Sequence, residues 1–217
     1  MIARSKLVQV LDWSRDRGFL GPGPVERHVE HAEGFAAAFQ SCAGYDPPSR
    51  FADMGTGGGI PGLVLAAIWS DCEVVLIDSM VRRTSMLTEF ASYLGFGNRC
   101  TIVTGRVEEL GRSVLRETFP LVTARSFAPP PVTAECGSSL VSVDGWLLVS
   151  EPPDQCAERE EQQERWPVAP LQRLSLAPPK IVVSTHRFAG FRKISGLTSQ
   201  YPRRVGVPER RPLWASA

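Results

Sequence analysis

Residues Phe51 to Gly62 read Phe-Ala-Asp-Met-Gly-Thr-Gly-Gly-Gly-Ile-Pro-Gly. The apolar start predicts a buried strand. The glycines after it predict a tight turn, because residues without a Cβ allow positive φ and let the backbone approach a ligand closely. Pro61 favours the first turn of a following helix. The lysine of a phosphate-binding P-loop is missing, which disfavours a nucleoside triphosphate. In open α/β sheets, ligands bind beyond the carboxyl ends of the strands, beside such a turn.

Strand and helix patterns alternate around this turn. Strands are predicted at 50–54, 73–77, 100–103, 121–124 and 145–149, and helices at 61–69, 80–94, 106–116 and 130–140. Two helices, at 3–17 and 25–39, come first, and 180–184 with 188–193 predict a terminal hairpin. This alternation is typical of right-handed crossovers between parallel strands. We therefore expect an α/β, Rossmann-like, doubly wound and mostly parallel sheet with a terminal antiparallel hairpin in residues 46–217, and a helical N-terminal cap in residues 1–45.

The composition is that of an ordinary globular protein, with 43% hydrophobic and 22% charged residues among 217. No apolar run approaches the ~18 residues that a membrane helix needs, and the amino terminus lacks a signal-peptide core. We therefore expect neither a membrane span nor secretion. The five cysteines are widely spaced and form no C-x-x-C pair, which argues against a disulfide framework or a zinc knuckle and favours a cytoplasmic location.

Basic residues gather near the carboxyl end, although the net charge is only +1. From Lys180 to Ala217 the chain carries six arginines and two lysines against one acid, whereas residues 151–165 carry six acids and two arginines. We predict RNA binding by four of these arginines, which neighbouring prolines would hold as an extended ridge. They are Arg203, Arg204, Arg210 and Arg211. The alternative is an ordinary solvated surface.

An acid stands at the end of the second predicted strand, where Val74 to Ile77 lead into Asp78. In dinucleotide-binding folds, a carboxylate at this place accepts hydrogen bonds from ribose hydroxyls. The glycine turn and Asp78 together fit either NAD or S-adenosylmethionine. Asp78 can also be a helix N-cap, and one residue can fill both roles.

Several ordered motifs resemble the glucose-inhibited division protein B family. They are Asp53 to Gly62, Leu76 to Ser79 with Arg82 and Arg83, Thr104 to Glu109, Thr123 to Ala128, and Tyr201 to Pro208 with Arg210 to Leu213. Members of this family are bacterial methyltransferases that transfer a methyl group from S-adenosylmethionine to guanine N7 in small-subunit ribosomal RNA. The resemblance covers residues 50–150 and the carboxyl end well, and the first 45 residues poorly.

The resemblance implies roles for individual residues. Gly55 and Ile60 would line the methionine and adenosine side of the cofactor, and Asp53, Gly57 and Gly59 would complete the cofactor-binding loop. Asp78 would hold the ribose, while Val107 and Glu108 would frame the adenine. Arg125 would stand at the mouth of the site as the catalytic residue, near cofactor and substrate. The implied partner is ribosomal RNA or the small ribosomal subunit. An ordinary helix-start acid at Glu108 and a surface ion pair at Arg125 stay open.

The chemistry implied by the family asks for little acid–base machinery. Guanine N7 carries a free lone pair, so its attack on a sulfonium methyl needs alignment and exclusion of water rather than a general base. A convincing His–Asp or Cys–His arrangement is therefore not required. His28 and His31 share a helix face, but a metal site needs a further ligand, and His186 is the one other histidine. We expect no metal.

The chain departs from the family pattern at three places. Residues 18–24 replace an Asn-Leu-Thr segment, His31-Ala32 stands where relatives carry Asp-Ser, and Glu151 stands where they carry a lysine. We expect Glu151 to repel an RNA phosphate.

Two alternative functions stay open. One is a relative that methylates another substrate, and the other is a non-catalytic protein that binds S-adenosylmethionine or RNA. An NAD-dependent dehydrogenase is disfavoured, because the turn lacks a clean G-x-G-x-x-G helix start. The target nucleotide, the form of the RNA substrate and the oligomeric state are open at this point.

Overall fold

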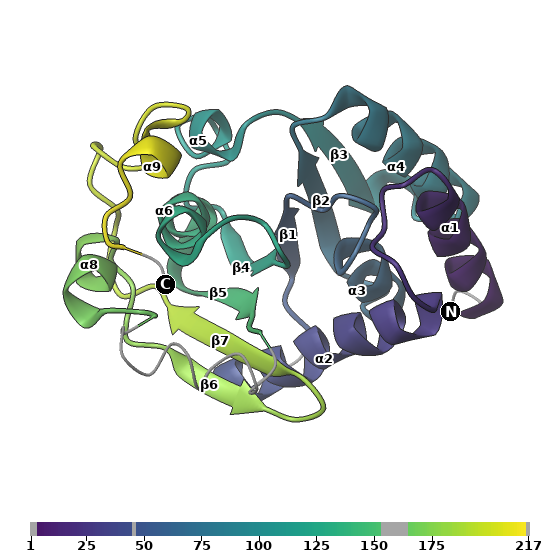
Figure 1. Ribbon diagram of the computed structural model, residues 1–217, viewed down its shortest axis with the longest axis horizontal. Helices are drawn as coiled ribbons and strands as arrows, with labels where there is room; N and C mark the ends of the chain where they lie inside the picture. Colours follow the sequence, from purple (N-terminus) through teal and green to yellow (C-terminus); the bar gives the residue numbers. More distant parts are fainter. Residues whose placement is uncertain (1–3, 45–46, 153–164, 216–217) are drawn as a thin grey trace.

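The computed structural model describes residues 4–44, 47–152 and 165–215 (Figure 1). Its strands are β1 (Arg50–Met54), β2 (Glu73–Asp78), β3 (Cys100–Thr104), β4 (Phe119–Ala124), β5 (Val141–Ser150), β6 (Lys180–Val183) and β7 (Arg187–Arg192). Its helices are α1 (Arg4–Asp16), α2 (Val25–Ala43), α3 (Gly62–Ile68), α4 (Val81–Tyr93), the short η1 (Gly97–Arg99), α5 (Val107–Leu110), α6 (Pro130–Leu140), α8 (Val168–Arg173) and α9 (Val207–Arg210). Cys156 and most of the acidic run of 151–165 lie outside the described residues.

The strands form one sheet in the order β3-β2-β1-β4-β5-β7-β6. The first five strands pair in parallel, and β7 pairs antiparallel with both β5 and β6. The predicted α/β sheet with its terminal hairpin is therefore confirmed. The chain runs outward from β1 to β3 and then returns to β4, so β1 and β4 lie side by side at the point where the winding reverses. In doubly wound sheets this switch point is where ligands bind.

Two layers of helices cover the sheet (Figure 1). Helices α1 to α4 contribute to one hydrophobic core, and α5, α6 and α8 contribute to the other. Successive strand residues point to opposite faces, so Phe51 belongs to the first core and its neighbour Ala52 to the second. None of the described helices is both long and apolar enough to cross a membrane.

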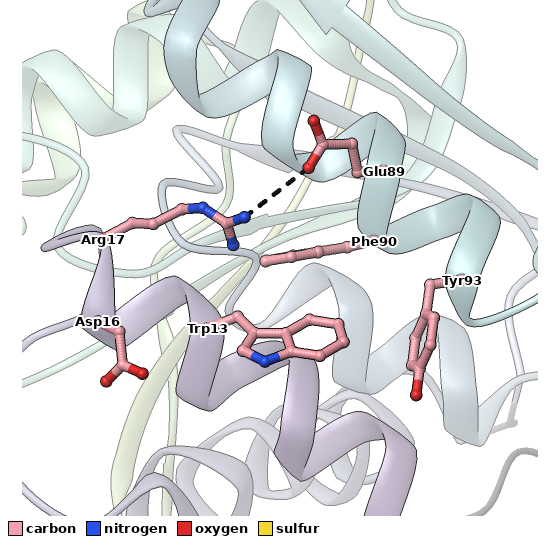
Figure 2. Close-up of a pocket in the computed structure, with 6 residues that line it drawn as sticks. All are labelled: Trp13, Asp16, Arg17, Glu89, Phe90 and Tyr93. Carbon is pink, nitrogen blue, oxygen red and sulfur yellow. Dashed lines mark ion pairs between the residues drawn. The ribbon is translucent and has the colours of Figure 1, made fainter.

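The N-terminal helices share the core of the sheet. Phe35 of α2 packs against Phe188 of β7, with ring centroids 4.8 Å apart. Figure 2 shows Trp13 of α1 beside Tyr93 of α4, where the ring centroids are 5.1 Å apart. These rings and the Arg17–Glu89 ion pair, at 3.9 Å, line an open groove of about 440 Å³ between α1 and α4. The second half of α4 lines this groove, whereas Asp78 lies just before the start of that helix.

The helix predicted at 106–116 is wrong beyond its first turn. Helix α5 ends at Leu110, and the residues after it form turns. The arginine side chains of this segment explain the difference, because they bind backbone carbonyls of the C-terminal segment. Arg112 donates to the Pro202 carbonyl at 2.7 Å, and Arg116 donates to the Leu197 and Tyr201 carbonyls, each at 2.7 Å. Long-range contacts thus override the local helix pattern.

The extended ridge predicted for the C-terminal arginines is also wrong, because residues 207–210 form the short helix α9. Arg203 is anchored to Glu135 of α6, whose carboxylate is fully buried. Glu135 accepts hydrogen bonds from Arg203 N at 2.7 Å, from Nε at 3.0 Å and from Nη2 at 2.6 Å. This bidentate pair fastens the C-terminal segment to the second core.

Replacing Glu135 by Ala is expected to lower the free energy of unfolding by about 3–5 kcal/mol, because the buried partner of Arg203 is lost. Glu89→Ala is the control. Glu89 is 69% exposed and lies 3.9 Å from Arg17, so its loss should cost less than about 1 kcal/mol. Urea unfolding measures both values. Equal losses in the two variants would contradict the role assigned to Glu135.

Candidate functional site

A buried carboxylate shapes the glycine turn. Asp53, at the end of β1, accepts a hydrogen bond from the Gly62 N–H at 2.9 Å and another from the Thr123 hydroxyl at 2.8 Å. It is fully buried. Burial raises the pKa of Asp53 to about 6, and hydrogen bonds and the charge of Arg125 oppose that shift. Asp53 therefore ties the end of β1 to the start of α3 and to β4.

A second carboxylate holds the outer side of the turn. One oxygen of Asp78 accepts a hydrogen bond from the Met80 N–H at 2.9 Å. The other accepts from the Gly57 N–H at 3.0 Å and from Arg83 Nη1 at 3.3 Å. The N-cap of α4 is Met80, so the N-cap alternative for Asp78 is wrong. Asp78 instead fixes the turn that leads from β2 into α4.

A cavity of about 310 Å³ opens beside these groups. Four of the predicted cofactor residues lie around it: Gly55, Asp78, Val107 and Glu108. The other loop residues that we predicted, Asp53, Gly57, Gly59 and Ile60, are not among the described residues that line it. Gly59 and Ile60 are buried, and Ile60 belongs to the first hydrophobic core. Asp53 and Gly57 instead take part in the hydrogen bonds that hold the loop.

The C-terminal segment closes one side of this cavity. Glu108 is 3% exposed, and its carboxylate accepts hydrogen bonds from the Gly206 N–H and from Arg106 Nη2, each at 3.2 Å. Burial raises the pKa of Glu108, but these hydrogen bonds and that of its own backbone N–H outweigh burial and lower it. Glu209 of α9 also lines the cavity. The sequence had not indicated that α9 takes part in the site.

A second cavity, of about 330 Å³, lies next to the first. Residues Ser126 to Ala128, which follow β4, border both cavities. The Phe127 ring lies against the glycine turn: a Cβ on Gly55 would stand 2.5 Å from it, and Gly55 has φ of +67°. Gly55 is therefore needed for both the turn and the ring contact. Phe127 forms a shared wall between the two cavities.

Arg125 borders the second cavity and is held by the N-terminal cap. Its Nη2 donates to His28 Nδ1 at 2.9 Å. Because arginine only donates, the ring proton of His28 must be on Nε2, which then donates to the Gly21 carbonyl at 3.2 Å. Burial lowers the pKa of His28, and the charge of Arg125 lowers it further. A neutral His28 thus orients the Arg125 guanidinium.

The cap also packs directly on the glycine turn. Ser14 of α1 donates to the Gly58 carbonyl at 2.9 Å. A Cβ on Gly58 would stand 2.6 Å from the Phe19 carbonyl, so a side chain there would displace the cap. Arg27-His28 resembles the Arg-His pair that the family carries ahead of the glycine turn, but no sequence pattern indicates that the cap packs on this turn. The cap is therefore part of the site.

The basic residues divide into two groups. Arg204, Arg210 and Arg211 are exposed, whereas Arg203 is paired with Glu135.

Glu151 is not free to repel an RNA phosphate, as we had expected. Its side chain is 4% exposed, and its carboxylate lies 2.8 Å from Arg165 Nε. Among the described residues, no group of three His, Cys, Asp or Glu side chains is placed to hold a metal ion.

The fold, with its glycine turn and the acid after β2, belongs to a class, the Rossmann-like fold that solved methyltransferases share. Cofactor-bound Rv0187 from MTB shares the fold, with a TM-score of 0.60 at 14% identity over 87% of this chain and 89% of that one. A geranyl diphosphate C-methyltransferase from Streptomyces coelicolor A3(2), solved with S-adenosyl-L-homocysteine, gives a TM-score of 0.55 at 9% identity over 75% and 79% of the two chains.

Residues 9–180 match the model of the GidB family, described as rRNA small subunit methyltransferase G, and the chain belongs to this family. Ribosomal RNA small subunit methyltransferase G from Syntrophomonas wolfei is 30% identical over 88% of this chain and 87% of its own length. The protein of the same name from Synechococcus sp. (strain CC9311) is 34% identical over 77% and 67%. The predicted family is confirmed, and the match extends into the N-terminal cap. The chain is an S-adenosylmethionine-dependent methyltransferase.

The pH dependence of stability is expected to report on His31, which packs against Phe35, Phe188 and His186. Burial, followed by the charge of Arg125, lowers its pKa from 6.5 to about 3. Between these two pH values His31 is protonated in the unfolded chain but neutral in the folded chain. The free energy of unfolding therefore falls as pH drops from 6.5 toward about 3. Between about pH 7.5 and 5.5, the native protein should lose roughly 1 kcal/mol more than His31→Phe in urea unfolding. Parallel pH profiles would contradict this.

Proposed function

We propose that this methyltransferase acts on N7 of a guanine in small-subunit ribosomal RNA. The observation that carries the proposal is the pair of adjoining cavities at the carboxyl ends of β1, β2 and β4. One is rich in carboxylates and the other contains Arg125, and both are bordered by Ser126 to Ala128. A methyl donor in the first cavity would face an acceptor base in the second. The family description supports ribosomal RNA as the acceptor.

The first cavity fits the adenosine part of S-adenosylmethionine. Its volume is at the lower end of the ~300–1,000 Å³ range of small-ligand sites. Asp78 would accept hydrogen bonds from ribose hydroxyls. The Arg83 guanidinium, whose Nη1 is 3.3 Å from Asp78, would move away to make room for the ribose. Val107 would pack on adenine, and Glu108 would accept from its amino group. Gly55 would line the cofactor cavity, while Asp53, Gly57, Gly59 and Ile60 would maintain the conformation of the loop.

The acceptor side needs positioning rather than proton transfer. When bound, S-adenosylmethionine supplies a methyl group on a positively charged sulfur. Guanine N7 has a lone pair ready to attack it, so the protein must align the base and exclude water. The half-buried Arg125, oriented by His28, offers a planar set of donors to a phosphate or a guanine edge. Phe127 offers an apolar wall between donor and acceptor.

The exposed arginines Arg204, Arg210 and Arg211 would contact RNA phosphates, and Arg203 would set their position through Glu135. We expect the protein to act in a reducing cytoplasm, where ribosomes are assembled, with the described cysteines Cys42, Cys72, Cys100 and Cys136 as thiols.

Isotope-labelled methyl transfer tests the function. Purified protein is incubated with methyl-labelled S-adenosylmethionine and small ribosomal subunits, or the naked RNA from them, taken from cells that lack the gene. Nucleosides are then identified by mass spectrometry. Label in N7-methylguanosine at one position supports the proposal; label in another nucleoside, or none on either substrate, overturns it.

Asp78→Ala is expected to weaken the binding of S-adenosylmethionine by about 1–3 kcal/mol, because charge-assisted hydrogen bonds to the ribose are lost. Asp71→Ala is the matched control, since Asp71 is an exposed acid just before the opposite end of β2. It should bind like the native protein. Calorimetry measures both, and equal affinities of the two variants would remove Asp78 from the cofactor site.

Arg125→Ala should lower kcat/KM for methyl transfer more than tenfold, equivalent to at least ~1.4 kcal/mol of transition-state stabilisation, with little change in thermal stability. The control is Arg17→Ala, which removes an arginine of the groove between α1 and α4 (Figure 2). An Arg125→Ala enzyme as active as Arg17→Ala would show that Arg125 is not part of the reaction site.

A further inference from the structure

The second cavity is bordered by Glu151, a carboxylate that has no role in the proposed methyl transfer as described above. Glu151 follows β5 and borders this cavity together with Arg125, Phe127 and Trp166. Its backbone N–H donates to the Arg187 carbonyl at 2.8 Å, which fixes the residue to the start of β7. The side chain is only 4% exposed. A buried carboxylate is costly unless polar groups face it.

Two neighbours fix the orientation of this carboxylate. Trp166 Nε1 donates to Oε1 at 3.1 Å, and Arg165 Nε lies 2.8 Å from Oε2. Burial raises the pKa of Glu151, and Arg165 and Trp166 oppose that shift and favour the ionised form. A carboxylate offers about four lone-pair sites. Of the partners within the described residues, Oε1 has the Trp166 hydrogen bond and Oε2 has the Arg165 ion pair, so each oxygen has a further lone pair for a ligand.

Guanine is the RNA base whose chemistry matches such an acceptor. Its N1–H and N2–H₂ donors are adjacent on one edge, so both meet the two oxygens of one carboxylate. Adenine and cytosine present an amino group next to an unprotonated ring nitrogen, which a carboxylate repels. Uracil flanks its N3–H with two carbonyl oxygens, which a carboxylate also repels. Bidentate, charge-assisted hydrogen bonds combine strength with geometric selectivity.

We propose that Glu151 is a specificity-determining residue of the acceptor cavity and accepts hydrogen bonds from N1–H and N2–H₂ of the target guanine. The inference rests on the proposed function. In guanine, the amino group and N7 lie on opposite sides of the bicyclic base. A guanine held at Glu151 thus has N7 on its far side, and the segment Ser126 to Ala128, which borders the same cavity, also borders the first one.

The same contact favours the methylated state. The N7 lone pair forms the new bond to the methyl carbon, and the electron pair of the broken carbon–sulfur bond leaves with the sulfur. The base gains a positive charge, which makes its N1–H a stronger donor. The hydrogen bond to Glu151 then strengthens during the reaction, and contacts that strengthen toward the transition state raise kcat. No proton needs to leave the base.

Inosine separates this role from a purely structural ion pair, because it keeps N7 and N1–H but lacks the amino group. Small-subunit RNA is prepared with guanosine or inosine at the methylated position, and kcat/KM is measured for both. The native enzyme should prefer guanosine at least about tenfold, since a site built to bind a donor rejects the analogue that lacks it. In Glu151→Gln, which offers one acceptor oxygen, the preference should fall below about threefold.

Glu89→Gln is the matched control. It makes the same change at an exposed carboxylate of α4 that borders neither cavity of the proposed site, so the preference for guanosine should persist. A native enzyme that methylates both RNAs equally overturns the inference without any variant, even if Glu151→Gln does not fold. An unchanged preference in folded Glu151→Gln also overturns it. A native enzyme that methylates no guanosine in this RNA overturns the proposed function itself, whereas the other two outcomes leave that function standing.

Discussion

Three segments of the chain meet at one buried carboxylate, that of Asp53. Its two oxygens take the Gly62 N–H at the start of α3 and the Thr123 hydroxyl of β4, so the end of β1 is fixed to both neighbours. Burying this charge is costly, which is why the pKa of Asp53 rises to about 6. The hydrogen bonds offset that cost and hold the ends of the glycine turn to α3 and β4. This turn lies at the switch point of the sheet, and both cavities open beside it.

The other parts of the site reach this turn from distant parts of the chain. The N-terminal cap contributes Ser14, which binds the Gly58 carbonyl, and His28, which orients Arg125. The C-terminal segment contributes Gly206, which binds Glu108 on the far side of the first cavity. The first and second cavities are thus bordered by opposite ends of the chain, by Glu209 and His31 respectively. We therefore expect a change at either end to alter the proposed methyl-transfer site through one of these hydrogen bonds.

Local patterns predicted the sheet, the glycine turn and the position of Asp78 at a strand end. Each of these features shows within a few consecutive residues, as an apolar run, a cluster of glycines or an acid after a strand. The contacts Arg125–His28 and Glu108–Gly206 join residues 97 and 98 positions apart, and no local pattern encodes them. The helix expected at 106–116 fails for the same reason, since Arg112 and Arg116 bind carbonyls about 85–90 positions away. The count of charges likewise grouped Arg203 with its exposed neighbours, because the sequence does not show that Arg203 forms an ion pair with the buried Glu135.

We propose that the two adjoining cavities are the donor and acceptor sides of one methyl-transfer site. A crystal structure of the complex with S-adenosylhomocysteine would test this placement. We expect ribose hydroxyls on the Asp78 carboxylate, adenine between Val107 and the Glu108 side of the first cavity, and the sulfur turned toward Phe127 and the cavity that contains Arg125. A ligand bound elsewhere, or one whose sulfur points away from Arg125, would contradict it.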